Sequence, residues 1–311
     1  MIKQWFRHSL RRVVKPVVVE LLANDHPNLQ ESKRIDEISA VDKELQILLQ
    51  LKYRELLQSK GTLPSFDDVQ LRAFSQHGED GVLLFIFSLV GTTNRRCIEI
   101  CAGDGIECNT ANLIINHGWD GLLVDGNERN VKRGKEFYAN CNDTRGWPPK
   151  FVHAWITTDS IDQLIRSHNF CGPVDLLSLD IDGNDYWVWE AIEAVEPRVV
   201  VLEYQNSWGP DHSVSQRYDP NYVWKPVPGS LGLSGASLRA FVNLGRRKGY
   251  RLVGVHSCNA FFIRDGIGDD AIPECPVDDC FDSSISRFNI QRRIDFERLN
   301  GSMIGKDWVV V

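Results

Sequence analysis

Between about residue 70 and residue 265, short apolar runs alternate with stretches in which apolar residues recur every three or four positions. The first pattern is typical of strands and the second of helices that cover a sheet. Runs such as 199–202 are apolar throughout, which indicates a sheet covered on both faces. The alternation predicts a doubly wound, mostly parallel sheet. We expect strands at 96–100, 121–125, 150–154, 175–180, 198–203, 250–255 and 260–264, and helices at 109–117, 127–138, 158–168, 184–194 and 236–247.

The last two predicted strands are connected differently from the others. Only the short segment Ser257–Asn259 separates them. A parallel connection needs a crossover of a dozen or more residues, whereas an antiparallel pair needs only a turn. We therefore expect a C-terminal antiparallel hairpin.

The first 65 residues have a helical pattern of their own, which ends at Gly61–Pro64. This helix either covers the main domain or pairs with another chain. Covering is favoured, because Lys52 interrupts the apolar stripe before it reaches the length of a coiled coil. The predicted organisation is a helical N-terminal extension (1–65), a Rossmann-like domain (66–270) and a C-terminal tail (271–311).

Charge and hydropathy narrow the classes of partner. The formal net charge of −7 argues against nucleic acid. The apolar stretch 13–23 is too short for a transmembrane helix and contains charged residues. The first 15 residues mix basic and apolar side chains, which is compatible with peripheral contact with a membrane surface, although a solvated leader helix is the favoured interpretation. The basic residues are Lys3, Arg7, Arg11, Arg12 and Lys15.

The eight cysteines show no CxxC spacing that would indicate a metal site. Several lie in predicted core segments, as is usual for free thiols in a reducing compartment, so we expect a cytoplasmic protein. Cys275 and Cys280 differ, because they flank an acidic loop. They could bind metal or pair with each other, but two unpaired surface thiols is the favoured interpretation.

The segment 96–110 carries the first candidate site. An apolar strand ends near Glu99, a turn with Gly103 and Gly105 follows, and a helix begins directly afterwards. The next strand ends in Asp125, twenty residues after Gly105. Open α/β sheets hold a nucleoside with such a unit, because the turn lets the ligand approach the backbone and the second acid accepts hydrogen bonds from the ribose.

Two cofactor classes fit this unit. A dinucleotide site needs a third glycine where this chain has Cys108, which weakens that interpretation. Sites for S-adenosylmethionine more often follow acid-x-Gly-x-Gly-x-Gly. Glu99, Gly103 and Gly105 match that pattern, and Cys101 takes the place of its first glycine. A turn without any ligand remains a third interpretation.

A second acidic group follows the predicted strand 175–180. Asp180 ends the strand, and the following turn contains Asp182 and Asn184. The carboxyl ends of parallel strands form the ligand crevice of an open sheet, so Glu99, Asp125, Asp180 and Glu203 should line one edge. The structural alternative is that Asp182 and Asn184 only cap the next helix.

A long aromatic segment separates Glu203 from Ser237. A loop of this length is usually a lid or a binding loop, and it should overhang the crevice. Its aromatic residues could stack on sugar rings or fasten the loop to the body. They include Trp208, Tyr218, Tyr222 and Trp224.

Three spaced motifs resemble the FkbM-type methyltransferase family: 75–81, 180–185, and 235–238 with 259–263. The resemblance covers roughly residues 70–265 and implies a class I methyltransferase fold with a seven-stranded sheet. It also implies S-adenosylmethionine as the cofactor and O-methyl transfer. The implied roles place Glu99, Cys101, Gly103 and Gly105 beside the methionine part of the cofactor, Asp125 at the ribose, and Asp180 with Asp182 facing the methyl group.

The predicted function is therefore an S-adenosylmethionine-dependent O-methyltransferase acting on a hydroxyl of a glycan or related secondary metabolite. Candidate general bases are Asp180, Asp182, His153 and Glu203. Alternatively, Asp180 and Asp182 could hold Mg²⁺, which prefers oxygen ligands. A nicotinamide-dependent oxidoreductase and a non-catalytic binding module are the competing functions.

Overall fold

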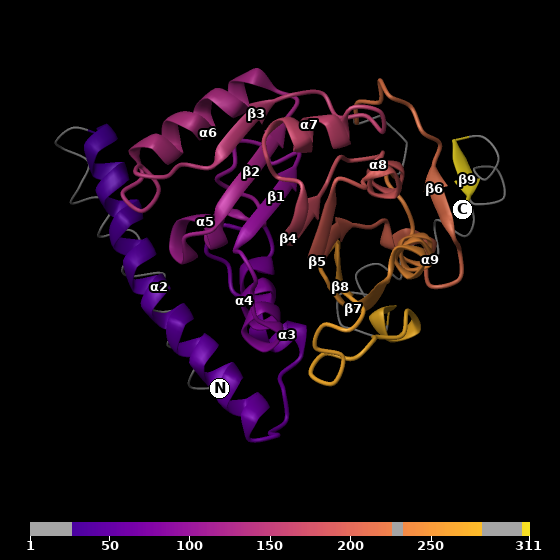
Figure 1. The fold of residues 1–311 in the computed structure, drawn as a ribbon, viewed down its shortest axis with the longest axis horizontal. Coiled ribbons are helices and arrows are strands. Elements are labelled where there is room, and N and C mark those ends of the chain that lie inside the picture. Colours follow the sequence, from indigo (N-terminus) through magenta and orange to yellow (C-terminus); the bar gives the residue numbers. More distant parts are fainter. Residues whose placement is uncertain (1–26, 226–232, 282–306) are drawn as a thin grey trace.

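A seven-stranded sheet forms the centre of the computed structural model, which describes residues 27–225, 233–281 and 307–311 (Figure 1). All seven predicted strands are present, and their bounds differ from the prediction by a few residues. The strands are β1 (Arg96–Ile100), β2 (Asp120–Asp125), β3 (Lys150–His153), β4 (Gly172–Leu179), β5 (Val195–Glu203), β7 (Tyr250–His256) and β8 (Asn259–Arg264).

The strand order is β3-β2-β1-β4-β5-β8-β7. The first five strands of this order are parallel, and β8 is antiparallel to both β5 and β7. The predicted hairpin therefore places an antiparallel strand next to β5. Dinucleotide-binding sheets of the order 3-2-1-4-5-6 have no such strand at this position. The mostly parallel seven-stranded sheet of a class I methyltransferase is confirmed.

Helices cover both faces of this sheet, as the uninterrupted apolar strands predicted. Alternate side chains of each strand enter two separate cores, one on each face. One face carries α4 (Glu79–Val90), α5 (Ala111–His117) and α6 (Glu128–Asn140). The other face carries α7 (Ile161–Ser167), α8 (Asp185–Ala191) and α9 (Leu238–Lys248).

The predicted N-terminal helix is α2 (Pro27–Gln58), which runs along one side of the molecule (Figure 1). It covers the domain through its C-terminal half, where Tyr53 packs edge-on against Phe85 at 5.0 Å between ring centroids. The buried Gln46 exchanges hydrogen bonds with Asn112 of α5. Within the described residues, no helix has both the length and the apolar character needed to cross a membrane. The basic residues 1–15 lie outside the described part of the chain.

A second, two-stranded sheet was not predicted from the sequence. It pairs β6 (Val214–Gln216) with β9 (Trp308–Val310) at the side of the molecule opposite α2 (Figure 1). Trp208 and Trp308 pack with tilted rings at 4.8 Å between ring centroids and are both buried. Residues 307–311 of the predicted tail are therefore attached to the segment that follows β5. The remaining short helices are α3 (Phe66–Val69), η1 (Asn206–Trp208) and η2 (Asp278–Phe281).

Candidate functional site

The parallel strands all end at one edge of the sheet, and this edge carries the polar residues that the sequence singled out. Glu99 belongs to β1, Asp125 ends β2, and Asp180 directly follows β4. Glu203 ends β5. Because β1 lies between β2 and β4, the glycine turn is flanked on both sides by a strand that ends in an acid.

Glu99 shapes the turn between β1 and α5. Its two carboxylate oxygens accept hydrogen bonds from the backbone N–H groups of Asn109 and Thr110, at 3.0 and 2.7 Å. Ser178 of β4 also donates to it, at 3.2 Å. Glu99 is 4% exposed, so nearly all of its capacity is used inside the protein. Glu99 therefore holds the backbone of this turn in place.

The two glycines of the turn have different roles. Gly103 has a φ of +59°, and a Cβ at this position would meet no atom within 4 Å. Gly105 has a φ of +72°, but a Cβ there would lie 2.9 Å from Phe151 and 3.0 Å from Leu123. Gly105 is thus needed for packing, whereas the open backbone at Gly103 is where a ligand can approach.

Cys101 occupies the left-handed region of backbone conformation, with a φ of +63°. This region favours glycine, and Cys101 stands where the cofactor pattern has its first glycine. The chain therefore keeps the backbone shape of the glycine pattern with a different residue. Burial, and then the charge of Asp125, raises the pKa of the Cys101 thiol well above its usual value.

Asp125 connects the end of β2 to the glycine turn. Its carboxylate accepts hydrogen bonds from the backbone N–H groups of Gly103 at 2.9 Å and Asn127 at 2.8 Å. The Asn130 side chain donates a third, at 3.2 Å. Asp125 is 8% exposed, so its carboxylate is buried beside the open glycine.

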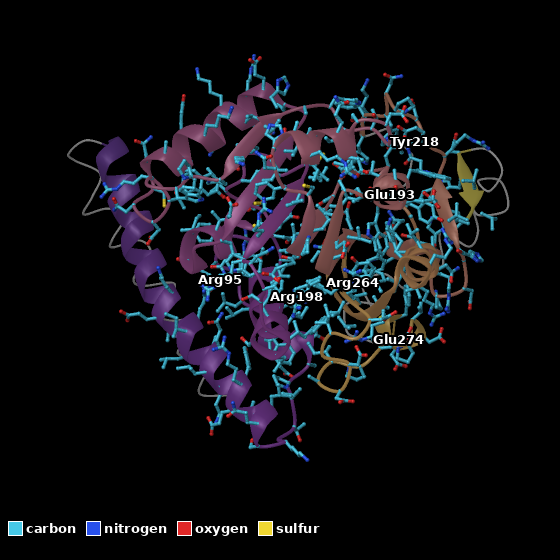
Figure 2. The ribbon with its side chains drawn as sticks, viewed as in Figure 1. Arg95, Glu193, Arg198, Tyr218, Arg264 and Glu274 are labelled. Carbon is cyan, nitrogen blue, oxygen red and sulfur yellow. The ribbon has the colours of Figure 1, made fainter. Side chains whose placement is uncertain are left out.

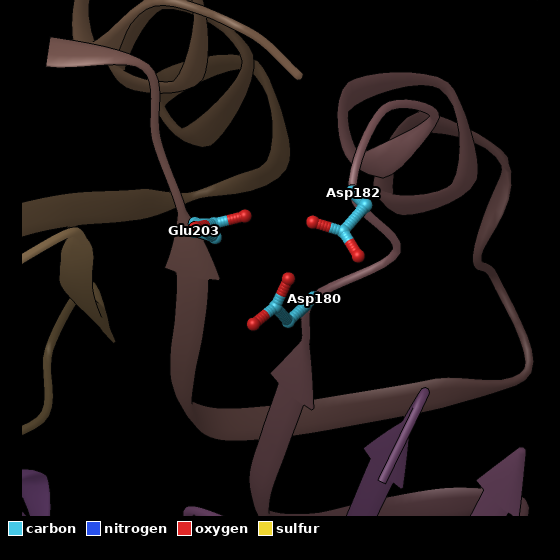
Figure 3. Close-up of side chains that lie close together, drawn as sticks. All are labelled: Asp180, Asp182 and Glu203. Atoms are coloured by element: carbon cyan, nitrogen blue, oxygen red, sulfur yellow. The ribbon is translucent and has the colours of Figure 1, made fainter. Parts of the chain in front are cut away.

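Asp180, Asp182 and Glu203 form a compact group beside this turn. Their nearest carboxylate oxygens all lie within 4.8 Å of one another (Figure 3). Asp180 and Glu203 are partly buried, and Asp182 is exposed. The φ of Asp182 is +60°, which aspartate tolerates better than most residues. Three carboxyl groups from two neighbouring strand ends therefore face one small volume.

The turn after β4 gets its shape from Asp185. Its carboxylate accepts hydrogen bonds from the backbone N–H groups of Ile181 at 2.7 Å and Gly183 at 3.0 Å. Asn184 takes the N-cap position of α8 but makes no capping bond, and its side-chain amide donates to the Asp219 carbonyl at 2.8 Å. Asp185 holds the turn through these two bonds, and the Asp180 carboxylate adds a hydrogen bond from the Asp182 backbone N–H.

Burial and neighbouring negative charges raise the pKa values of the carboxyl groups at this site. Burial, and then the charge of Asp180, raises the pKa of Glu203. Burial also raises the pKa of Asp180, and a side-chain hydrogen bond joins the two groups. Both shifts go in the same direction, so the crowding of these two carboxyl groups favours uptake of a proton by the pair. Burial raises the pKa of Asp185 to about 7, with the charge of Asp180 adding to the effect.

The contrast with Asp175 shows that this arrangement is unusual within the molecule. Asp175 is fully buried at the other end of β4, where it meets Arg198 at 3.3 Å and accepts three backbone N–H groups. No lysine, arginine or histidine among the described residues forms an ion pair with Asp180, Asp182 or Glu203. Unpaired crowded acids cost stability, which points to a function.

His153 does not join this group. It ends β3, which is three strands away from β4 in the sheet, a separation of roughly 14 Å at the usual strand spacing. Its side chain is exposed and contacts the Gly126 carbonyl at 3.2 Å. We therefore leave His153 out of the candidate catalytic group.

Two polar residues at this edge were missed as site residues in the sequence. Glu79, at the start of α4, accepts hydrogen bonds from the Asn259 side chain at 3.0 Å and from the His77 backbone at 2.9 Å. Asn259 pairs with Glu203 in the β5–β8 register. The signal available was an acid directly before an apolar helix and an asparagine in a hairpin turn, both inside the motifs that carry the resemblance.

The segment after β6 lies over the turn after β4. A Cβ on Gly183 would lie 2.5 Å from the Tyr222 ring, so that ring rests on the turn. The Trp155 indole donates to the Pro220 carbonyl at 2.7 Å, and its ring rests on Gly126, next to Asp125. Trp155 is 51% exposed. This segment forms a wall at the crevice mouth.

Two aromatic residues between Glu203 and Ser237 fasten this part of the chain to the body. The Tyr218 hydroxyl accepts a hydrogen bond from the Thr158 backbone at 3.2 Å, and Figure 2 marks its place. Trp208 is buried against Trp308. Tyr218 and Trp208 therefore fasten the loop to the body, which is one of the two roles that the sequence allowed for its aromatic residues.

No family model matches the chain, and no curated protein matches it. Similar solved structures include an S-adenosylmethionine-dependent methyltransferase from Clostridium acetobutylicum ATCC 824 (8% identity, TM-score 0.39, 61% of this chain and 93% of that one). Others are an O-methyltransferase from Bacillus cereus with SAH (14%, 0.35, 68% and 78%) and a methyltransferase from Thiobacillus denitrificans with S-adenosyl-L-homocysteine (12%, 0.36, 78% and 86%).

The chain has the class I methyltransferase fold by its own strand order. The narrower resemblance to the FkbM-type family stays a prediction carried by the sequence motifs.

Proposed function

We propose that the protein is an S-adenosylmethionine-dependent O-methyltransferase, of the FkbM type, that acts on a hydroxyl of a glycan or related secondary metabolite. The observation that carries the proposal is the convergence of Asp180, Asp182 and Glu203 beside the open glycine turn. The site then combines a turn that can hold a nucleoside with carboxyl groups that can take up a proton.

The residues of the glycine turn and the neighbouring Asp125 fit the cofactor. Gly103 offers open backbone, and Asp125 has a carboxylate at the wall beside it. Glu99 and Cys101 hold the turn in the conformation that this approach requires, and Gly105 packs it against β2 and β3. S-adenosylmethionine, when bound, supplies an electrophilic methyl group. The protein orients both reactants, which can lower the barrier by up to about 7–11 kcal/mol.

The carboxyl pair supplies the proton chemistry. In this mechanism Glu203 carries the shared proton and Asp180 is the charged partner, because burial and the charge of Asp180 raise the pKa of Glu203. An acceptor hydroxyl within hydrogen-bond reach of Asp180 can give its proton to that carboxylate. General-base assistance of this kind contributes about 10²–10⁴-fold.

A metal route is the second candidate for the same group. Three carboxylates within 4.8 Å form the kind of oxygen donor set that suits Mg²⁺. Asp180 and Asp182 would hold the ion, with Glu203 as a third ligand. A bound Mg²⁺ would lower the pKa of an acceptor hydroxyl without a dedicated base.

The competing functions make different predictions for ligand binding. We expect calorimetry on the full chain to give binding of S-adenosylhomocysteine and no response to NAD or NADP. Binding of NAD or NADP alone would reverse the cofactor assignment in favour of an oxidoreductase. Absence of binding to all three would favour a non-catalytic module.

The eight free cysteines support the predicted cytoplasmic location.

A further inference from the structure

Two cysteines meet in the segment that follows the β7–β8 hairpin. The sulfur atoms of Cys275 and Cys280 are 3.6 Å apart. Glu274, which Figure 2 labels, directly precedes the pair, and η2 contains Cys280. The Cys275 backbone N–H donates to the Leu252 carbonyl of β7 at 2.8 Å, which fixes one end of the loop. Five residues along the chain thus bring two thiols into contact.

The two thiols differ in their surroundings. Cys280 is 7% exposed, and Cys275 is partly buried. Both line a cavity of about 480 Å³, bounded mainly by apolar side chains and open to solvent. Small oxidants therefore have a path to Cys275, while Cys280 lies behind it. Other residues lining this cavity include Leu63, Phe66, Phe85, Val253 and Ile272.

A metal site explains this pair poorly. Within the described residues, Asp180, Asp182 and Glu203 form the only group of three or more potential ligands close enough to share an ion. No described histidine, cysteine or carboxylate therefore completes a three-ligand set with Cys275 and Cys280. A soft metal such as zinc normally takes four ligands. Two contacting thiols without further ligands fit redox chemistry better.

We propose that Cys275 and Cys280 form a reversible dithiol–disulfide site, with Cys275 as the attacking thiol and Cys280 as the resolving one. Closing the bond moves the sulfurs from 3.6 Å to about 2.05 Å, a small adjustment within one short loop. The site is separate from the crevice and does not rest on the proposed methyl transfer.

The reaction with a peroxide balances as follows in atoms and electrons. The Cys275 thiolate attacks one peroxide oxygen, the O–O bond breaks, and hydroxide leaves, giving a sulfenic acid. The Cys280 sulfur then attacks the Cys275 sulfur, the S–O bond breaks, and water leaves. Two thiols lose two electrons and two protons in total, and one hydrogen peroxide becomes two waters. A dithiol reductant reverses the change by thiol–disulfide exchange.

The electrostatics agree with this order of events. The hydrogen bond from Cys280 lowers the pKa of the Cys275 thiol. The same contact raises the pKa of Cys280, and burial raises it further. The thiolate, which is the reactive form, is therefore favoured on the more accessible sulfur.

Peptide mass spectrometry tests the proposal on the full chain. Trypsin cleavage after Arg264 and Arg287 gives a peptide that contains both cysteines and no others. After mild hydrogen peroxide and alkylation, we expect this peptide to lose two hydrogens and to resist alkylation. Dithiothreitol should restore both alkylation sites. Cys171→Ser is the matched control, because Cys171 is exposed and its loss should leave the peptide's behaviour unchanged.

Two variants test the assigned roles. In Cys280→Ser, dimedone should trap a sulfenic acid on Cys275, whereas in Cys275→Ser, Cys280 should remain unlabelled. Labelling of Cys280 alone would overturn the assigned order. Stable alkylation of both cysteines after peroxide, or oxidation of the peptide to sulfinic acid without a disulfide, would overturn the proposal itself.

Discussion

At the scale of single residues, the crevice separates acids that hold the structure from acids that remain free for chemistry. The carboxylate oxygens of Asp185 and Glu99 accept hydrogen bonds from backbone N–H groups. Asp180 and Asp182 face Glu203 across a small gap. Substitutions at these positions should therefore affect different measurable properties.

Replacing Asp180 or Asp182 by asparagine should lower turnover by about 10²-fold or more, as for loss of a general base or a metal ligand. Affinity for S-adenosylhomocysteine should change little, because we propose that these residues face the acceptor rather than the cofactor. Turnover is measured with a panel of sugar and glycolipid acceptors. Asp143→Asn, an exposed acid paired with Lys43, is the control.

EDTA then distinguishes the two routes in the wild type. Activity that is lost with EDTA and restored by Mg²⁺ supports the metal, and indifference supports the base. Full turnover in both asparagine variants would remove the turn from the mechanism.

Replacing Asp125 by alanine should weaken S-adenosylhomocysteine binding by about 10- to 150-fold, since hydrogen bonds to a charged group contribute about 1.5–3 kcal/mol. Asp125→Asn should lose less, because one oxygen remains for the Gly103 backbone. Calorimetry measures both. The control is Asp104→Asn in the same turn, whose carboxylate pairs with Arg133 at 3.2 Å. Equal affinity in folded Asp125→Ala would place the ribose elsewhere.

Cys101 offers a test of backbone shape. Its φ of +63° is natural for glycine and costly for a β-branched residue. Cys101→Gly should keep the cofactor affinity, whereas Cys101→Val should be about 1–2 kcal/mol less stable than the glycine variant. Urea unfolding gives the difference. If valine were tolerated as well as glycine, the left-handed conformation would not be required here.

At the scale of elements, the strands could be predicted because a sheet covered on both faces needs uninterrupted apolar runs. The edge acids followed from the same reasoning, since each comes at the end of such a run. Which of two neighbouring glycines packs and which stays open could not be predicted, because Gly105 is constrained by Phe151, some 46 residues later. His153 was included because chain order does not show that β3 is an edge strand.

Two elements escaped prediction for different reasons. Helix α4 is buried almost all round, so its apolar residues show no periodicity that separates a helix from a strand. The β6–β9 pair consists of two three-residue strands about 90 positions apart in the chain. Strands this short have no sequence pattern, and tertiary contacts such as the one between Trp208 and Trp308 stabilise them.

The β6–β9 pair should control the segment that forms the crevice wall. Trp308→Ala removes a buried side chain, a change that costs about 3–5 kcal/mol in a packed core. We expect faster amide hydrogen exchange over residues 214–222, with little change in S-adenosylhomocysteine affinity. Val310→Ala is the matched control, because Val310 is 73% exposed in the same strand. Unchanged exchange in Trp308→Ala would show that the wall is held by other contacts.

At the scale of the whole molecule, the crowded acids should determine how stability depends on pH. Asp180, Asp185 and Glu203 all have a pKa raised above the value of an unfolded chain, first by burial and then by neighbouring charges. The folded protein therefore holds protons that the unfolded chain releases. A raised carboxyl pKa stabilises the folded state below the unfolded value near 4, and that contribution is lost as pH rises through the folded value.

The free energy of unfolding should accordingly fall as pH rises from about 5 to about 8, by about 1.4 kcal/mol per pH unit for each proton involved. Asp185, with a pKa of about 7, contributes its full slope at about pH 5 to 6 and loses that contribution as pH passes through about 7. Urea unfolding at four pH values measures the slope. Glu203→Gln should reduce the slope, because it removes one titrating group and relieves Asp180, whereas Asp143→Asn should leave it unchanged. A free energy that instead rises over this range would mean that these carboxyl groups are ionised in the folded protein, and the shared proton between Asp180 and Glu203 would have to be abandoned.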